Sequence, residues 1–128
     1  MMRTPRLIGG MLLVLMSLST AQADPWQSTQ AQQNRDALGV VSLADLPGEA
    51  RETLRAIKQS GSFEYDRDGV VFGNRERILP KRQRGYYHEY TVKTPGVRHR
   101  GTRRIVCGIV PECYYTADHY KSFARIKE

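Results

Sequence analysis

Residues 86–92 have the sequence YYHEYTV, a run of aromatic and β-branched side chains that favours an extended strand. Comparable runs occur at 70–72, 103–106 and 123–126. Gly, Pro, Asn and Asp residues separate these runs, as is typical of short strands joined by turns. The second half of the chain is therefore predicted to form a β-sheet.

Residues 46–61 precede these strands and show a helical periodicity instead. Ala50, Leu54 and Ile57 recur at intervals of four and three, which gives one apolar stripe, and Gly61 suits the end of a helix. A helix followed only by strands cannot form parallel βαβ crossovers. The expected class is α+β, with one N-terminal amphipathic helix packed on a C-terminal antiparallel β-sheet.

Length and composition limit the chain to one small domain. With 128 residues, of which 40% are hydrophobic, it is neither wholly disordered nor long enough for two domains. Two cysteines cannot support a disulfide-dense miniprotein, and no repeat of 20 to 50 residues is found. The formal charge of +7 favours polyanionic partners such as nucleic acids, although the same charge can simply keep a secreted protein soluble.

The first 23 residues have the features of a cleaved secretory signal peptide. Arg3 and Arg6 precede an apolar run at 7–18, and residues 21–23 supply the small side chains that a signal peptidase reads. A membrane anchor is the alternative, but about twelve apolar residues are fewer than the roughly 20 needed to span a bilayer. We therefore expect a secreted protein, extracellular or periplasmic, whose mature form is not held in a membrane.

The mature chain begins with a polar segment. Residues 24–39 are rich in glutamine and are predicted to be a flexible leader, so that the folded domain would occupy 40–128.

The two cysteines are expected to form a disulfide. Export places Cys107 and Cys113 in an oxidising compartment, and the intervening turn could bring the two sulfur atoms together across a hairpin. A zinc site with His119 as a further ligand would lack the close spacing of strong zinc motifs. No metal site is therefore predicted.

Alternation along 86–92 places Tyr87, Glu89 and Thr91 on one face of the strand. A carboxylate there needs a cationic partner. The candidates are Arg98, Arg100, Arg103 and Arg104. They could form an ordinary ion-pair network across strands, or a phosphate clamp beside a general base, because guanidinium groups match phosphate oxygens. His119 could supply a complementary acid, although a lone histidine is usually a surface residue.

Seven short segments carry a more specific pattern. They are DGVVF (68–72), GNRE (73–76), LP (79–80), GYYHEYTV (85–92), TPG (94–96), RGTRRI (100–105) and YYTADHY (114–120). In order and spacing they resemble the secreted microbial guanyl-specific ribonucleases, the barnase-like group, from about Val40 to Ile126. The resemblance implies the microbial ribonuclease fold. It also implies cleavage of single-stranded RNA 3′ of guanosine, without a cofactor, through a 2′,3′-cyclic phosphate to a 3′-phosphate.

The resemblance also implies residue roles. Glu89 matches the general base and His119 the general acid, while Arg100 and Arg104 match the clamp on the transition state. The residues implied in guanine binding are Phe72, Asn74, Arg75, Glu76 and Tyr120. Without the flanking matches, Asn74 to Glu76 would be read as an ordinary polar turn. Two features depart from the family pattern: glycine at position 73, and the position of the cysteine pair.

Two alternatives to a simple secreted nuclease remain open at this stage. The protein could be a catalytically inactive secreted module that binds RNA through its basic sheet. It could also be a nuclease toxin that an acidic, barstar-like inhibitor restrains by docking on the Arg100 and Arg104 surface, as the resemblance suggests. In each case a monomer is expected, with RNA as the ligand.

Overall fold

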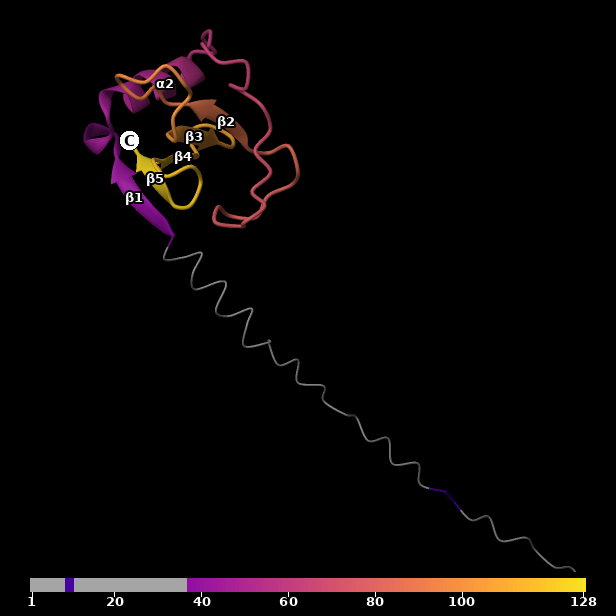
Figure 1. The fold of residues 1–128 in the computed structure, drawn as a ribbon. Coiled ribbons are helices and arrows are strands. Elements are labelled where there is room, and N and C mark those ends of the chain that lie inside the picture. The colour runs from indigo at the N-terminus through magenta and orange to yellow at the C-terminus, as the bar shows by residue number, and fades with distance from the viewer. Residues whose placement is uncertain (1–8, 11–36) are drawn as a thin grey trace, which may run out of the picture.

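The computed structural model describes residues 9–10 and 37–128. The described elements are a strand β1 (Leu38–Ser42), a 3₁₀ helix η1 (Leu43–Asp45), a helix α2 (Gly48–Lys58), and strands β2 (His88–Thr91), β3 (Arg104–Cys107), β4 (Cys113–Thr116) and β5 (Phe123–Lys127) (Figure 1). The predicted signal peptide, apart from residues 9 and 10, and the leader from 24 to 36 lie outside the described residues. The described part is α+β, as predicted.

The sheet is mixed, which corrects the prediction of a purely antiparallel sheet. Its strands lie in the order β1-β5-β4-β3-β2, and β1 pairs with β5 in parallel while the other neighbours are antiparallel. Leu38 lies opposite Phe123, and Ser42 lies opposite Lys127. Strand β1 is an edge strand with no fully buried residue, so it lacks the alternating apolar pattern that identifies a strand in a sequence. It begins at Leu38, within the segment predicted to be a leader.

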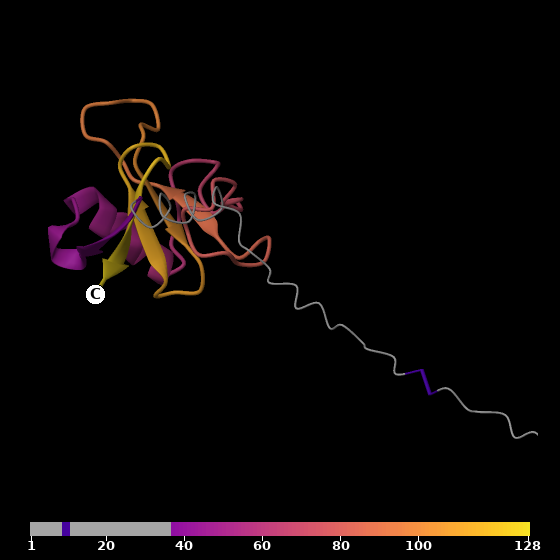
Figure 2. The ribbon, with the colours of Figure 1, turned by 90° about the horizontal axis from the view of Figure 1, so that it is seen from below.

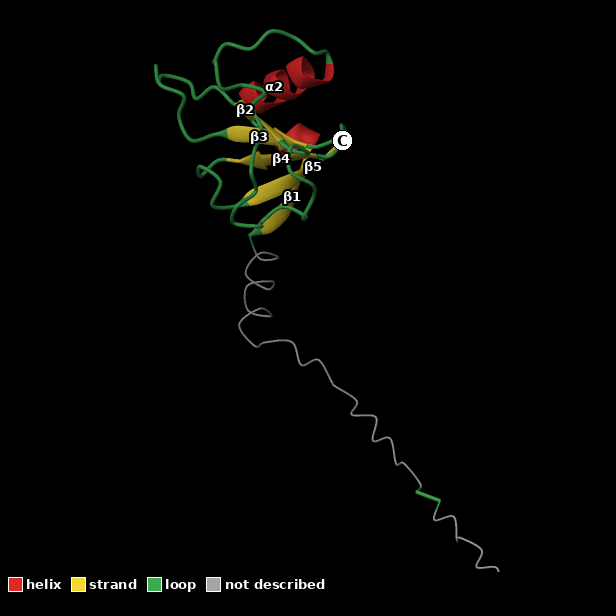
Figure 3. Ribbon diagram, turned by 90° about the vertical axis from the view of Figure 1, so that its right-hand side faces the viewer, coloured by secondary structure: helices red, strands yellow, loops and turns green. Residues whose placement is uncertain are grey.

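Helix α2 packs on one face of the sheet, beside β3, and is the one α-helix among residues 9–10 and 37–128 (Figure 3). It starts after Pro47, two residues later than predicted, and ends before Gln59. Ala50 and Leu54 are buried, as the apolar stripe predicts. The core on this face consists of Leu46, Ala50, Leu54, Val92, Ile105, Cys107, Cys113 and Ile126. No helix in the described part of the chain is long and apolar enough to cross a bilayer.

The connection from α2 to β2 covers a second core and runs beside β2 (Figure 2). Backbone hydrogen bonds join its residues 69–72 to β2 and to the residue that precedes it. The N–H of Gly69 donates to the carbonyl of Glu89 (2.8 Å), and the N–H of Phe72 donates to the carbonyl of Tyr87 (2.9 Å). The predicted strand at 70–72 is therefore only an isolated bridge at Val71. These hydrogen bonds fix the start of the next loop against the centre of the sheet.

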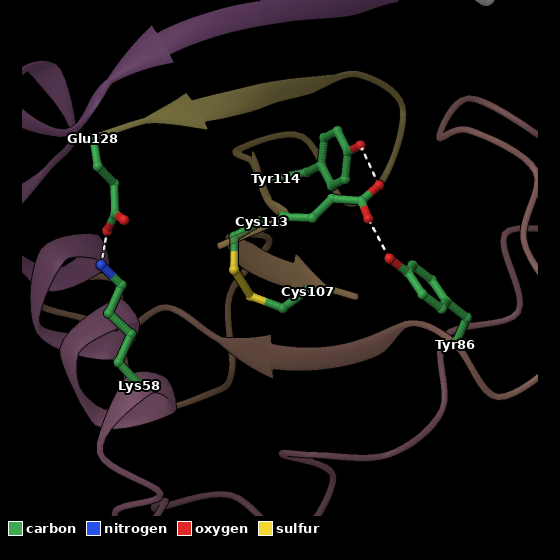
Figure 4. The surroundings of a disulfide bond; sticks show 7 residues. Lys58, Tyr86, Cys107, Cys113, Tyr114 and Glu128 are labelled. Atoms are coloured by element: carbon green, nitrogen blue, oxygen red, sulfur yellow. Dashed lines mark hydrogen bonds and ion pairs between the residues drawn. A yellow bond between two sulfur atoms is a disulfide. The ribbon is translucent and has the colours of Figure 1, made fainter. Parts of the chain in front are cut away.

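Strands β3 and β4 form a hairpin that the predicted disulfide closes. Cys107 and Cys113 are opposite each other in the register and their sulfur atoms are bonded (Figure 4). The prediction of a bridge across a hairpin is confirmed. Next to it, the Glu112 carboxylate accepts hydrogen bonds from the hydroxyls of Tyr86 and Tyr114.

Candidate active site

A cavity of about 370 Å³ opens beside the centre of β2. Its walls come from β2, from the loop after residue 72 and from the segment between β4 and β5. The lining residues are Arg67, Val71, Phe72, Gly73, Asn74, Arg75, Glu76, Ile78, Glu89, Tyr120 and Phe123. The cavity thus brings together the one acidic residue predicted on β2 and all five residues predicted to bind a base. Arg67 and Ile78 were not predicted, since neither belongs to a segment that carries a chemical signal.

Glu89 lies at the centre of this arrangement. Its exposed fraction is 7%, which makes it the one buried carboxylate among the residues described. The Tyr120 hydroxyl donates to Oε2 at 3.0 Å, and Nη2 of Arg100 lies 3.7 Å from Oε1. Thr91 on β2 and Tyr87, just before the strand, are also buried, and alternation places both on the same face as Glu89. The carboxylate faces the cavity and retains lone pairs that can accept a further proton.

Tyr120 links the carboxylate to an aromatic wall. Burial, together with the charge of Glu89 and the hydrogen bond to it, raises the pKa of the Tyr120 hydroxyl. The hydroxyl therefore remains a donor at neutral pH. The ring of Tyr120 stacks on Phe72 with centroids 5.2 Å apart, and Phe72 also contacts Phe123 at 5.8 Å. This stack gives the cavity a flat apolar surface that suits a planar ring.

Two arginines lie near the Glu89–Tyr120 pair, although neither lines the cavity: Arg100 pairs with Glu89, and Arg104 lies over the Tyr120 ring. Arg100 is oriented by Thr91, whose hydroxyl accepts from Nε at 3.0 Å and from Nη2 at 2.9 Å. Arg104 is only 2% exposed, and its Nη1 donates to the backbone carbonyls of Gly101 (3.0 Å) and Arg103 (2.7 Å). The role of Thr91 could have been inferred only from its shared strand face with Glu89.

The guanidinium of Arg104 is incompletely hydrogen-bonded. Its carbon lies 5.9 Å from the centre of the Tyr120 ring, and its buried Nε has no acceptor among the described residues. A buried cation with a free donor is unfavourable unless an anion lies nearby. Arg100 and Arg104 thus place two guanidinium groups beside the Glu89–Tyr120 pair, and guanidinium groups match phosphate oxygens.

His119 lies next to the cavity, although it is not one of the lining residues. Its ring is exposed, and its centroid is 4.8 Å from that of Tyr120. The backbone at His119 and Tyr120 is left-handed, with φ of 54° and 71°, a conformation that residues other than glycine rarely adopt. Such a backbone needs strong local support.

Asp118 and Thr116 provide that support. The N–H of Tyr120 donates to the Thr116 hydroxyl at 3.2 Å, and the same hydroxyl donates to Asp118 at 2.9 Å. Burial alone would raise the pKa of Asp118, but hydrogen bonds from Ser122 and Thr116 lower it below its usual value. The ionised Asp118 thus holds the turn that presents His119. Neither Asp118 nor Thr116 was singled out from the sequence.

Asn74 determines the shape of the loop that carries Glu76. Its side-chain Nδ2 donates to the carbonyl of Leu79 at 3.0 Å, and its Oδ1 accepts from the Leu79 N–H at 3.2 Å. The Asn74 backbone is left-handed, with φ of 49°, and its carbonyl accepts from the N–H of Arg77. Because both amide atoms of Asn74 are engaged by Leu79, its side chain positions the loop, while Glu76 remains exposed at the cavity.

The described residues contain no group of three or more His, Cys, Asp or Glu side chains that could hold a metal ion. The two cysteines proposed as alternative ligands with His119 are joined in the disulfide.

Both the sequence and the fold of this chain are similar to those of known proteins. A family model described as ribonuclease matches residues 27–127. Guanyl-specific ribonuclease Sa of Kitasatospora aureofaciens is 55% identical over 94 residues, which cover 73% of this chain and 98% of the relative. Guanyl-specific ribonuclease St of Saccharopolyspora erythraea is 57% identical over 83 residues, covering 65% and 82%. The crystal structure of ribonuclease Sa2 with guanosine-2′-cyclophosphate superposes with a TM-score of 0.67 at 51% identity, covering 70% of this chain and 96% of that chain.

Proposed function

Because the chain belongs to the ribonuclease family, we propose that it is an endoribonuclease that cleaves single-stranded RNA 3′ of guanosine. The observation that carries the proposal is a buried carboxylate, Glu89, that lines a cavity and pairs with Arg100. Arg104 lies over the ring of Tyr120, whose hydroxyl donates to Glu89. The relatives are guanyl-specific ribonucleases, and a similar solved structure holds guanosine-2′-cyclophosphate. RNA is therefore the substrate we assign.

The proposed reaction has two steps. Glu89 takes the proton of the guanosine 2′-hydroxyl, whose oxygen attacks the adjacent phosphorus atom while the bond to the leaving 5′-oxygen breaks. His119 donates a proton to that oxygen, and a 2′,3′-cyclic phosphate results. Water then attacks the cyclic phosphate with the two side chains in exchanged roles, which gives a 3′-phosphate. DNA lacks the 2′-hydroxyl and would bind without being cut.

Arg100 and Arg104 would stabilise the transition state electrostatically. Negative charge accumulates on the non-bridging oxygens as the nucleophile attacks, and preorganised donors are most effective where water is excluded. The guanidinium of Arg104 is preorganised in this sense, because the backbone carbonyls of Gly101 and Arg103 hold its Nη1 in place. Thr91 keeps Arg100 aligned for the same phosphate.

Guanine selection would depend on Glu76 and Phe72. Both line the cavity, and Phe72 offers its ring for stacking on the base. Guanine presents two N–H donors on one edge, N1–H and the exocyclic amine, that a carboxylate can accept. Adenine presents an acceptor nitrogen there and would leave the carboxylate without a partner.

A Glu76→Gln variant is expected to lose discrimination between guanine and adenine. The unpaired carboxylate costs on the order of 1 to 3 kcal/mol, so the ratio of kcat/KM for GpU to that for ApU should fall by about 5- to 150-fold. Steady-state kinetics on the two dinucleotides measure the ratio, with Glu52→Gln on α2 as a control of equal charge change. A Glu76→Gln ratio equal to that of the control would contradict the assignment.

Product analysis tests the proposed activity directly. The protein, incubated with GpU in excess EDTA, should release guanosine 2′,3′-cyclic phosphate first and guanosine 3′-phosphate later, because the proposed protons move between side chains without a metal. Retention of RNA in a gel shift with no cleavage would instead favour the inactive RNA-binding module. Activity that EDTA abolishes would overturn the mechanism.

The proposal extends to where the protein acts. Export by the signal peptide at 1–23 would deliver a monomeric nuclease to the periplasm or the medium. There, or before export, an acidic inhibitor could dock on the Arg100 and Arg104 surface, to which its charge is complementary.

A further inference from the structure

A second cavity, of about 520 Å³, adjoins the candidate active site. The two cavities share residues 71–75, which thus form a common wall between them. The second cavity is completed by residues 82–85 and Tyr87, from the segment that leads into β2. None of these residues takes part in the mechanism described above, apart from those of the shared wall.

The charge of this groove is entirely positive. Arg75, Arg82 and Arg84 line it, and no acidic residue does. All three arginines are exposed, and within the described part of the chain neither Arg75 nor Arg84 forms an ion pair. Like charges gathered in a concave surface concentrate the positive potential and favour a polyanion.

Neighbouring side chains hold Arg82 in place, and a backbone turn orders the segment that carries Arg84. The guanidinium of Arg82 lies 5.4 Å from the centre of the Tyr86 ring and 3.6 Å from the Glu112 carboxylate, which does not line the groove. The N–H of Tyr86 donates to the carbonyl of Gln83 at 3.1 Å, in a turn where Gly85 has φ of 88°. Arg82 therefore precedes an ordered turn at the edge of the groove, and Arg84 belongs to that turn.

We propose that this groove binds the phosphodiester backbone of RNA on the 5′ side of the cleaved guanosine. The inference rests on the proposed function. In that function the guanosine 3′-phosphate lies at Glu89 and Arg100, and the leaving nucleotide departs past His119, so the strand remaining on the enzyme is the 5′ one. The groove adjoins the base-binding cavity across the shared residues 71–75, and guanidinium groups match phosphate oxygens in pairs.

Binding of uncleavable oligonucleotides tests the groove independently of turnover. Each of the three probes contains one 2′-deoxyguanosine, which lacks the attacking hydroxyl. The first is a dinucleotide with a 3′-uridine, the second is a pentamer that extends this dinucleotide with uridines on the 5′ side, and the third is a pentamer that extends it with uridines on the 3′ side. Both probes should bind more weakly as salt rises from about 50 to 200 mM. Because the 5′-extended pentamer would contact two more phosphates, its affinity should fall by about sevenfold more than the affinity of the dinucleotide.

The variant Arg82→Gln with Arg84→Gln should abolish this extra salt dependence. It keeps a polar side chain at each position and should leave the base-binding loop and cleavage of GpU unchanged. Arg75 is spared because it lines both cavities. The double variant Arg55→Gln with Lys127→Gln removes the same charge at two exposed residues outside the groove and should behave as wild type.

Two results would overturn the proposal. One is a salt dependence that stays unchanged in the Arg82 and Arg84 variant. The other is a 3′-extended pentamer that loses as much affinity with rising salt as the 5′-extended pentamer does. If the wild type fails to cleave GpU but shows the predicted dependence on the 5′ extension, the groove assignment stands while the proposed activity fails.

Discussion

A Glu89→Gln variant is expected to lose about 10²- to 10⁴-fold in kcat, the usual contribution of a general base. The amide has the size of the carboxylate and can still accept the hydrogen bond from Tyr120, so the fold should survive. It cannot take the proton of the 2′-hydroxyl. The loss should appear with GpU and equally with guanosine 3′-(4-nitrophenyl phosphate), because both substrates need the 2′-oxygen to be activated. Initial rates of cyclic phosphate formation measure it.

Glu112→Gln is the matched control for Glu89→Gln. Glu112 is also a partly buried carboxylate that tyrosine hydroxyls contact, but it does not line the candidate active site. Burial would raise the pKa of Glu112, yet hydrogen bonds from Tyr86 and Tyr114 lower it below its usual value. The control should therefore lower the melting temperature and leave kcat nearly unchanged. A Glu89→Gln enzyme as active as this control would rule out Glu89 as the base.

A His119→Ala variant is expected to lose about 10²- to 10⁴-fold in kcat on GpU but far less on guanosine 3′-(4-nitrophenyl phosphate). Uridine leaves through its 5′-oxygen and needs a proton, whereas nitrophenolate is stable without one. The pair of substrates thus distinguishes the acid from the base, since Glu89→Gln should impair both. Because His119 is exposed, its removal should leave the melting temperature close to that of the wild type.

His88→Ala serves as the control for His119→Ala. His88 belongs to β2 like Glu89, but by alternation its side chain projects from the opposite face, and it does not line the cavity. Full activity of His88→Ala beside a strong, substrate-dependent loss in His119→Ala would support the assignment. Equal losses of the His119 variant on the two substrates would contradict it.

Most elements of the fold could be predicted because their signals are local. The helix and the strands around residues 89, 105 and 125 follow from spacing within a few side chains, and the burial of Ala50 and Leu54 follows from the same periodicity. Strand β1 was missed because an exposed edge strand is held by backbone hydrogen bonds to β5, which depend little on side-chain type.

The candidate site was predictable as a set of residues but not as an arrangement. Side-chain chemistry and the resemblance of the motifs indicated Glu89, Arg100 and Glu76. Neither indicated that Thr91 orients Arg100 or that both amide atoms of Asn74 bond to Leu79. These contacts join side chains to partners whose position depends on the fold of the whole loop.

The amino-acid sequence alone determined the α+β class, the helical and extended segments, the cysteine pair and the residue types needed for proton transfer. Those properties depend on neighbours within a few positions along the chain. Only the tertiary structure decided that β1 runs parallel to β5, that His119 lies beside the cavity rather than among its lining residues, and that Arg82 and Arg84 share a groove with the base-binding loop. Such relations depend on backbone pairing and packing between distant segments, which local side-chain patterns do not encode.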